Sequence, residues 1–318
     1  MENLVNEQRN KIINEKDVGV KAIPIEIINK NLSAICLLKV GANEDKEKGT
    51  GFFIKINMGK EYIFLITASH VIDDDYINDA QQFEIFFNFE KGSSSKKKET
   101  INEKATVKVK RKERKIICLK KQDITAIEII DTDEFKNKIK CLFCDLNYID
   151  GNNTQYINQD IFILQHPRGE VAHVAAGKII ELDKKDDYKF MHTASTDGGS
   201  SGSPIILYNN ERVVGVHKGA LQINNEEIVN LGTFIGVIID EIKELIMKEE
   251  EEEEEKEEEE EDEKENDNLN NENEGEDDLN NKSNLFRYKI NGEERIAKKS
   301  DSIVVKLNDV ISFSNKII

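Results

Sequence analysis

The stretch Thr196-Asp197-Gly198-Gly199-Ser200-Ser201-Gly202-Ser203-Pro204 places Ser201 within a run of glycines and serines. Glycine reaches positive φ at no steric cost, so such a run can turn sharply and leave backbone N–H groups free. A serine nucleophile suits such a turn, because its hydroxyl must be exposed to a base and the substrate oxyanion needs preorganised donors. We therefore predict Ser201 as a nucleophile. The competing interpretation is an ordinary Gly/Ser-rich loop.

Two upstream segments supply a base and a carboxylate. The apolar, strand-like run 63–72 carries one histidine, His70, and Asp123 stands at the start of an alternating apolar strand at 123–129. We predict His70 as the general base and Asp123 as the residue that orients its imidazole. Taken singly, each has a structural interpretation, His70 as a histidine at a strand end and Asp123 as a cap of a strand start.

Three short motifs hold these residues, and a fourth precedes them in the chain. In order they are Gly49-Thr50-Gly51-Phe52-Phe53-Ile54, Thr67-Ala68-Ser69-His70, Asp123-Ile124-Thr125-Ala126-Ile127 and Gly199-Ser200-Ser201-Gly202-Ser203-Pro204. On these motifs the chain resembles the trypsin-like (chymotrypsin-fold) serine peptidases, over roughly residues 33 to 245. In motif style it is similar to glutamyl endopeptidase-like and compact intracellular and bacterial members. The resemblance implies an all-β fold of two packed Greek-key β-barrels, with the site in the cleft between them. It also implies a serine endopeptidase that forms an acyl-enzyme with protein or peptide substrates and uses no cofactor or metal.

The same resemblance assigns the remaining site residues. It makes the backbone N–H groups of Gly199 and Ser201 the oxyanion hole. It places Thr196, His217 and Gly219 in the specificity pocket, as in glutamyl endopeptidases and some viral 3C-like enzymes, which hold a P1 glutamate or glutamine. An imidazole and a hydroxyl can hydrogen-bond a carboxylate or an amide, and a buried polar pocket disfavours an apolar side chain. The alternative is that His217 only packs beneath the pocket. The other histidines are predicted to be structural or surface residues: His166, His173 and His192.

Ser200 departs from the digestive members of the family. The resemblance implies an aspartate at this position, directly before the nucleophile, which pairs with a newly freed N-terminus and activates the zymogen. Because this chain has a serine there, we expect that switch to be absent and the chain to be active without N-terminal cleavage.

The acidity of the chain is confined to one segment. The formal net charge is −18, but residues 249–278 hold 21 Asp and Glu against two lysines, and the rest of the chain is left with +1. This tract could attract a basic protein partner. Residues 96–121 carry 12 Lys and Arg against 3 Glu with no aromatic residue among them. We interpret them as the solvated face of a β-ribbon, and we expect no nucleic-acid partner, since such grooves interleave aromatic side chains.

Targeting signals and cysteine usage give further expectations. The N-terminal segment has no apolar run of a secretion signal and no run approaches membrane-spanning length, which predicts a cytoplasmic or nuclear protein without a membrane partner. The spacing Cys141-Leu142-Phe143-Cys144 is that of a redox couple or half a zinc site, but a second pair is missing. We predict buried, reduced cysteines that serve the structure: Cys36, Cys118, Cys141 and Cys144.

The composition shifts along the chain predict its domain organisation. A helix at 238–247 closes the peptidase domain, and Asn291-Gly292 between apolar runs predicts a hairpin near the C-terminus. The acidic tract could prolong that helix for some turns, although like charges at i,i+4 oppose this. The alternative to a peptidase is a catalytically silent scaffold of the same fold that binds partners through its acidic tail. The predicted parts are an N-terminal extension at 1–32, a peptidase domain at 33–248 with barrels at about 33–135 and 139–240, an acidic, disordered low-complexity linker at 249–284, and a small β-rich segment at 285–318.

Overall fold

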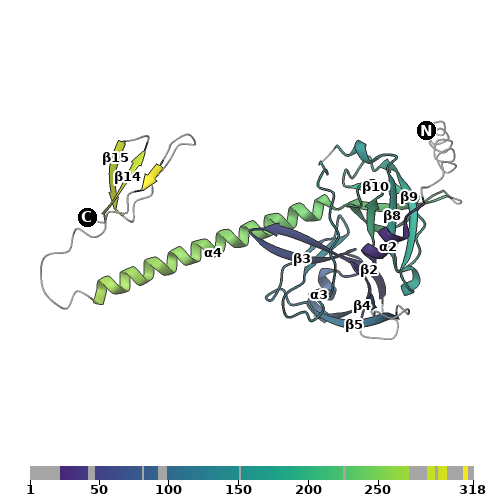
Figure 1. The fold of residues 1–318 in the computed structure, drawn as a ribbon, viewed down its shortest axis with the longest axis horizontal. Coiled ribbons are helices and arrows are strands. Elements are labelled where there is room, and N and C mark those ends of the chain that lie inside the picture. The colour runs from purple at the N-terminus through teal and green to yellow at the C-terminus, as the bar shows by residue number, and fades with distance from the viewer. Residues whose placement is uncertain are drawn as a thin grey trace, which may run out of the picture. The chain divides into compact units, whose positions relative to one another are not determined.

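The structure of the chain is a computed structural model, and it divides into two compact units, the first of which ends at Glu250. The first unit is built on two β-sheets (Figure 1). This confirms the predicted all-β fold class with two barrel-like sheets. The described residues are 22–41, 47–80, 82–91, 99–149, 152–224, 227–271, 285–290, 293–298 and 311–313.

The N-terminal sheet has seven antiparallel strands in the order β5-β4-β1-β2-β3-β7-β6. β-branched and aromatic residues dominate its centre, as in the fully buried run 62–66 of β3. Such residues suit a pleated surface that is covered on both faces. The strands are β1 (Ile35–Val40), β2 (Glu47–Met58), β3 (Lys60–Thr67), β4 (Gln82–Lys91), β5 (Glu99–Lys108), β6 (Ile116–Leu119) and β7 (Ile124–Glu128).

The C-terminal sheet is a closed barrel in the order β10-β13-β12-β11-β8-β9. Its strand β11 begins at Pro204, directly after the Gly/Ser-rich turn. Proline is tolerated at the first position of a strand, so the turn passes straight into a strand that is buried along its length. The strands are β8 (Asp160–Gln165), β9 (His173–Leu182), β10 (Lys189–His192), β11 (Pro204–Leu207), β12 (Val213–Asn224) and β13 (Glu227–Phe234).

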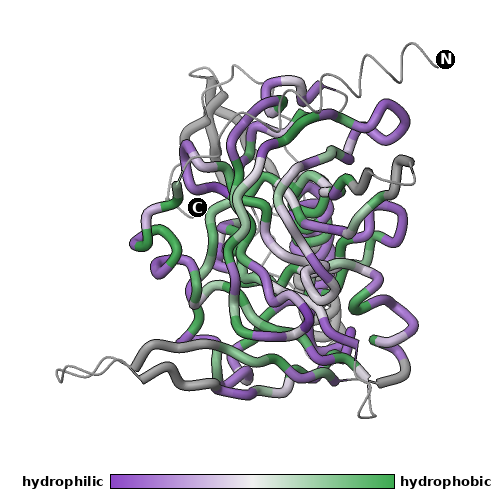
Figure 2. Tube along the Cα trace, turned by 90° about the vertical axis from the view of Figure 1, so that its right-hand side faces the viewer, coloured by the Kyte–Doolittle hydropathy of each residue, from purple (hydrophilic) through white to green (hydrophobic). Residues whose placement is uncertain are grey.

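A shared apolar core holds the two sheets together. Phe52 and Phe64 of the N-terminal sheet belong to the same buried cluster as Phe162 and Val216 of the barrel. Each such side chain contributes about 1.5–3 kcal/mol when it leaves water, so the cluster fixes one sheet against the other. Two further clusters fill the interior of each sheet separately. Figure 2 shows hydrophobic segments running along the strands, with hydrophilic residues in many of the connections.

Two short helices and one long one complete the first unit. α2 (Ile25–Leu32) packs its apolar face against the shared core, so the end of the predicted N-terminal extension is part of the folded body. α3 (Asp74–Ala80) follows β3. α4 begins at Gly236. Its isoleucines recur at helical spacing and are all buried in the shared core, which confirms the predicted C-terminal helix. These isoleucines are Ile238, Ile239, Ile242 and Ile246. The single-turn 3₁₀ helices are η1 (Thr154–Tyr156) and η2 (Pro167–Gly169).

The closing helix continues through most of the acidic tract. α4 runs from Gly236 to Asn271, so residues 249–271 are helical. Glutamate and lysine are good helix formers, and a helix that is already nucleated on a packed core propagates more easily than one that must start alone. The helix propensity of glutamate and lysine and the nucleation on the core together outweigh the like-charge repulsion between neighbouring turns. The rest of the predicted linker, 272–284, lies outside the described residues.

The second unit contains a small antiparallel sheet. β14 (Leu285–Ile290) pairs with β15 (Glu293–Lys298), and Ile290 lies opposite Glu293. This pairing confirms the predicted hairpin strands, while the turn pair 291–292 itself is outside the described residues. β16 (Ile311–Phe313) pairs with the other edge of β14. None of the helices in the described part of the chain is both long and apolar enough to cross a membrane.

The four cysteines are all free thiols. Burial raises the pKa of Cys141 to about 11 and that of Cys144 to about 12. A thiol with such a pKa is protonated at neutral pH and is a poor nucleophile and metal ligand. This supports the structural interpretation of the CxxC spacing.

The packing of α4 predicts which part of the helix stabilises the first unit. We expect Ile242→Ala to lower the free energy of unfolding by about 2–5 kcal/mol, because it leaves a cavity in the shared core. Met247→Ala, at a position 46% exposed, is the matched control and should change the free energy of unfolding by less than about 0.5 kcal/mol.

A chain that ends at Glu250 should unfold in urea at the wild-type midpoint. A lower midpoint for that shortened chain would show that the acidic helix also stabilises the core.

Candidate active site

The strand register brings His70 and Asp123 to the same edge of the N-terminal sheet. His70 lies three residues beyond the end of β3, and Asp123 directly precedes β7. The two strands are antiparallel neighbours, with Thr67 opposite Thr125. Because the last residue of one strand lies beside the first residues of the other, the segments that carry the base and the carboxylate emerge together.

His70 and Asp123 are joined by three hydrogen-bond contacts. The imidazole Nδ1 lies 2.9 Å from Oδ2 and 3.0 Å from Oδ1 of Asp123, and the backbone N–H of His70 donates to Oδ1 at 2.9 Å. A carboxylate can only accept, so Nδ1 carries the proton and Nε2 is left as the basic nitrogen. Asp123 has φ = 60°, in the left-handed region that aspartate tolerates better than most residues. The turn accepts this backbone conformation and thereby aims the carboxylate at His70.

Charge–charge contacts set the protonation of this pair. The hydrogen bond that His70 donates to Asp123 raises the pKa of His70 above its ordinary value, against the effect of burial and of the nearby Lys218 ammonium. Burial opposes ionisation of Asp123, but the hydrogen bonds from His70 and the charge of Lys218 keep the pKa of this carboxyl below its usual range. Lys218 belongs to β12, and its Nζ lies 3.8 Å from Asp123 Oδ2. The ion pair therefore crosses from one sheet to the other.

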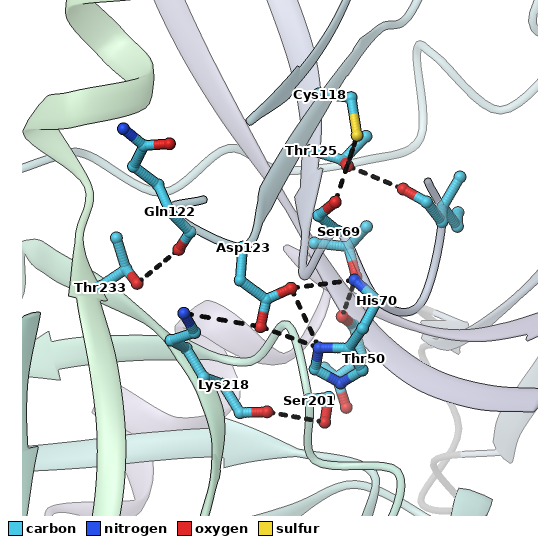
Figure 3. A network of polar contacts seen from close by, with 12 residues as sticks. Thr50, Ser69, His70, Cys118, Gln122, Asp123, Thr125, Ser201, Lys218 and Thr233 are labelled. Carbon is cyan, nitrogen blue, oxygen red and sulfur yellow. Dashed lines mark hydrogen bonds and ion pairs between the residues drawn. The ribbon is translucent and has the colours of Figure 1, made fainter. Parts of the chain in front are cut away.

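Ser201 lies at the same place from the barrel side. Figure 3 shows the imidazole of His70 between the carboxylate of Asp123 and the side chain of Ser201. The hydroxyl of Ser201 donates to the backbone carbonyl of Lys218 at 3.0 Å. To reach Nε2 of His70 it has to rotate away from that carbonyl. Catalytic hydrogen bonds are often formed only when substrate is bound, so this rotation is compatible with a nucleophilic role.

Gly202 allows the serine turn to approach the first sheet. Its φ is +86°, and a Cβ at this position would lie 2.2 Å from the carbonyl oxygen of Thr50 and 2.9 Å from the nitrogen of Ala68. Any side chain here would push the turn away from the end of β3, where His70 emerges. The glycine after Ser201 is thus required both by its backbone conformation and by the closeness of the two sheets.

The turn leaves two amides available for an oxyanion. The N–H of Ser200 donates to Asp197 and that of Ser203 to Ser200, at 3.0 and 3.1 Å. Among the described residues, the N–H groups of Gly199 and Ser201 have no hydrogen-bond acceptor. The two residues predicted for the oxyanion hole therefore offer free donors on either side of one peptide. The buried Ser200, predicted as the departure from zymogen-type members, accepts a hydrogen bond from the N–H of Asp197 at 3.2 Å.

A cavity of about 550 Å³ opens beside Ser201. The structure brings all three predicted pocket residues to its wall, Thr196, His217 and Gly219. The hydroxyl of Thr196 donates to Oδ1 of Asn230 at 2.7 Å, and Nδ2 of Asn230 donates to the Ala194 carbonyl at 2.7 Å. That second bond fixes which end of the Asn230 amide faces Thr196. The hydroxyl proton of Thr196 is therefore engaged by Asn230, and Oγ1 keeps its lone pairs as acceptors.

His192 is a wall residue that the sequence analysis placed among structural or surface histidines. It is buried, lines the same cavity, and its Nε2 lies 3.2 Å from Nδ1 of His217. Burial lowers the pKa of His217 to about 4 and that of His192 well below its ordinary value, so both rings are neutral at pH 7. The signal that could have identified it is its position four residues before Thr196. His166 is buried and its N–H donates to Thr50 Oγ1, whereas His173 is exposed, as predicted for structural and surface residues.

The two buried imidazoles contact each other and the backbone of Leu231. Nε2 of His192 lies 3.2 Å from Nδ1 of His217, so one of these rings donates a hydrogen bond to the other. A hydrogen bond to the backbone of Leu231 raises the pKa of each ring, but the effect of burial is larger and leaves both rings neutral at pH 7.

The chain matches one family model and is similar to several solved structures. The family model described as a trypsin-like peptidase domain matches residues 49–216, more than half of the chain, including His70, Asp123 and Ser201. No curated protein in the comparison matches the chain. Among solved structures it is similar to the serine endoprotease from Yersinia pestis, with 13% identity, a TM-score of 0.48, and coverage of 72% of this chain and 68% of that one. It is also similar to the tobacco vein mottling virus protease, with 14% identity, a TM-score of 0.42, and coverage of 69% and 82%.

The charges around His70 predict its titration. We expect NMR to find the pKa of the His70 imidazole above its ordinary value of 6.5 in the wild-type chain. Asp123→Asn removes the contact that raises this pKa and should lower it, whereas Lys218→Met removes an opposing positive charge and should raise it further. Lys120→Met is the control, because this exposed lysine pairs with Asp75 and should leave the His70 titration unchanged. A fall in the His70 pKa in Lys218→Met would contradict this account.

Proposed function

Since the chain belongs to the trypsin-like peptidase family, we propose that it is a serine endopeptidase that works through a triad of His70, Asp123 and Ser201. The observation that carries the proposal is the contact between Nδ1 of His70 and the Asp123 carboxylate, with the Ser201 turn against the same strand end. That arrangement supplies a nucleophile, a base and a residue that fixes the tautomer of the base.

The chemistry follows from the protonation of the three groups. Ser201 Oγ attacks the scissile carbonyl carbon while its proton passes to Nε2 of His70. The imidazolium that forms is stabilised by Asp123, which stays ionised. The tetrahedral intermediate then collapses, the C–N bond breaks, and Nε2 gives its proton to the leaving amine. Water repeats the sequence on the acyl-enzyme and releases the acid product with Ser201 restored.

The oxyanion of each tetrahedral intermediate would be bound by the N–H groups of Gly199 and Ser201. Both donors are free in the resting turn. Preorganised donors that need no rearrangement stabilise developing charge most effectively, and losing one costs on the order of 100- to 1000-fold in rate.

The cavity beside Ser201 supports a P1 glutamine or glutamate, and its hydrogen-bond polarity favours glutamine. With the proton of His217 on Nε2, that nitrogen is a donor, and the lone pairs of Thr196 Oγ1 are acceptors. A primary amide carries one acceptor and two donors, so its oxygen can meet His217 and its nitrogen Thr196. A carboxylate offers acceptors only. No lysine or arginine among the described residues lines the cavity and both imidazoles are neutral, so a glutamate would be desolvated there without a cation.

Active-site labelling tests the peptidase proposal and the absence of a zymogen switch together. An intact, uncleaved wild-type chain should react with a fluorophosphonate probe, and mass spectrometry should place the adduct on Ser201. Ser201→Ala and His70→Ala should lose the label while keeping the wild-type fold by circular dichroism. Labelling only after N-terminal trimming would overturn the absence of the switch. An intact fold without any labelling would favour the silent binding scaffold.

A peptide-library profile tests the pocket. We expect cleavage after glutamine to exceed cleavage after glutamate and after leucine. Thr196→Val removes the acceptor for the amide nitrogen and should reduce kcat/KM for a P1-glutamine substrate by roughly 10- to 100-fold, the cost of a buried group left unpaired. Thr196→Ser keeps the hydroxyl and is the matched control. A flat profile, or equal losses in the two variants, would contradict the proposed pocket.

A further inference from the structure

Thr50, in the Gly49-Thr50-Gly51 motif of β2, uses every polar atom that it has. The residue is fully buried. Its backbone N–H donates to the carbonyl of Ser201 at 2.8 Å, and its hydroxyl donates to the carbonyl of Gly199 at 2.9 Å. Its Oγ1 accepts the N–H of His166 at 3.0 Å, and its carbonyl accepts the hydroxyl of Thr67 at 2.9 Å. Two of these bonds reach from the first sheet into the turn that carries Ser201.

The hydroxyl of Thr50 has a defined direction. A backbone N–H can only donate, so the bond from His166 occupies a lone pair of Oγ1. The hydroxyl proton is therefore free for the Gly199 carbonyl. His166 also lies against the turn, since a Cβ on Gly199 would be 2.8 Å from the His166 carbonyl oxygen. One hydroxyl thus links β2, the segment after β8 and the serine turn.

The bonds from Thr50 act on alternate peptides of that turn. The carbonyl of Gly199 belongs to the 199–200 peptide, and that of Ser201 to the 201–202 peptide. The two free N–H groups belong to the interleaved peptides, 198–199 and 200–201. The carbonyl of Gly198 accepts the N–H of Arg168, and the carbonyl of Ser200 accepts the N–H of Ser203. With all four carbonyls engaged, the amides of Gly199 and Ser201 have a fixed direction.

Gly199 makes this restraint necessary. Its φ is +87°. Glycine has the widest choice of backbone conformations, so the 199–200 peptide that follows Gly199 can rotate unless its polar groups are held. Without the Thr50 hydroxyl, the Gly199 carbonyl would lose its only hydrogen bond among those found in the described residues.

We propose that Thr50 is the positioning residue of the oxyanion hole, holding the Gly199 carbonyl so that the N–H groups of Gly199 and Ser201 face the substrate carbonyl oxygen. The proposal rests on the peptidase function proposed above. Thr50 touches neither the nucleophile's hydroxyl nor the base in any recorded hydrogen bond of the described residues, so it acts through the turn. Its contribution is expected in the transition state and not in the binding of the substrate side chains.

The test compares Thr50→Val, Thr50→Ser and Tyr156→Phe with the wild type. Valine is nearly isosteric with threonine but leaves His166 N–H and the Gly199 carbonyl unpaired, whereas serine keeps the hydroxyl. Tyr156→Phe removes one buried hydrogen bond, to Asp145 at 3.0 Å, which involves no residue of the turn. It controls for a loss of stability alone. Circular dichroism and urea unfolding establish that each variant is folded at the assay temperature.

The expected result is a split between kcat and KM. Thr50→Val should lower kcat by roughly 10- to 1000-fold, the range spanned by weakening or losing an oxyanion donor, and leave KM within about threefold. Its affinity for a peptide aldehyde, whose adduct with Ser201 places an oxygen in the hole, should fall by a similar factor. Thr50→Ser and Tyr156→Phe should retain kcat within about threefold of wild type. A Thr50→Val kcat near wild type, a change in KM alone, or an equal loss in Thr50→Ser would overturn the proposal.

A second measurement separates failure of this proposal from failure of the peptidase function. Fluorophosphonate labelling of the wild type reports the function by itself. Amide hydrogen exchange reports the turn by itself: Thr50→Val should speed exchange at Ser200 and Ser203, whose N–H groups are bonded within the turn. Unchanged exchange at these amides would show that Thr50 does not hold the turn, whether or not the wild type is labelled.

Discussion

The close approach of the 199–202 turn to the ends of β2 and β3 is the constraint on which the rest of the site depends. There is no room for a side chain at Gly202, where the backbone meets Thr50 and Ala68. That contact exists because the shared apolar core holds the sheets together a short distance away, through residues such as Phe52 and Phe162. A small separation of the sheets would remove Ser201 from His70 and the Gly199 carbonyl from the Thr50 hydroxyl together. Packing and chemistry are therefore coupled through one seam.

Histidine takes opposite electrostatic roles on the two sides of Ser201. His70 has a carboxylate partner, which raises its pKa. His192 and His217 have mainly each other, and burial lowers the pKa of both. The same side chain is thus a titratable base on one side and a neutral hydrogen-bonding wall on the other. Lys218 connects the two regions, since its ammonium group faces Asp123 and its carbonyl holds the resting hydroxyl of Ser201.

The sequence predicts the chemistry-bearing residues better than it predicts their surroundings. His70 and Asp123 could be selected because they stand at the ends of apolar, strand-like runs. Ser201 could be selected because it stands among glycines. The pocket residue His192 could not, because its role comes from a partner 25 positions away, in another strand. No function could be assigned to Thr50 from the sequence, since its hydroxyl bonds to Gly199 and His166, both more than 100 positions away. How far the closing helix continues into the acidic tract could not be predicted, because that helix starts on a packed core that lies outside the tract itself.

By itself, the sequence determined the β-rich class, the turn at Ser201 and the glycines within it, because strand periodicity and positive φ are local properties that each residue carries. It also determined that the charge of the chain lies in one tract. Only the tertiary structure decided the contact between His192 and His217, the resting partner of the Ser201 hydroxyl, and the hydrogen bonds of Thr50. Hydrogen-bond direction and pKa depend on which polar groups meet in a site that excludes water, and those groups meet only when the two sheets have packed.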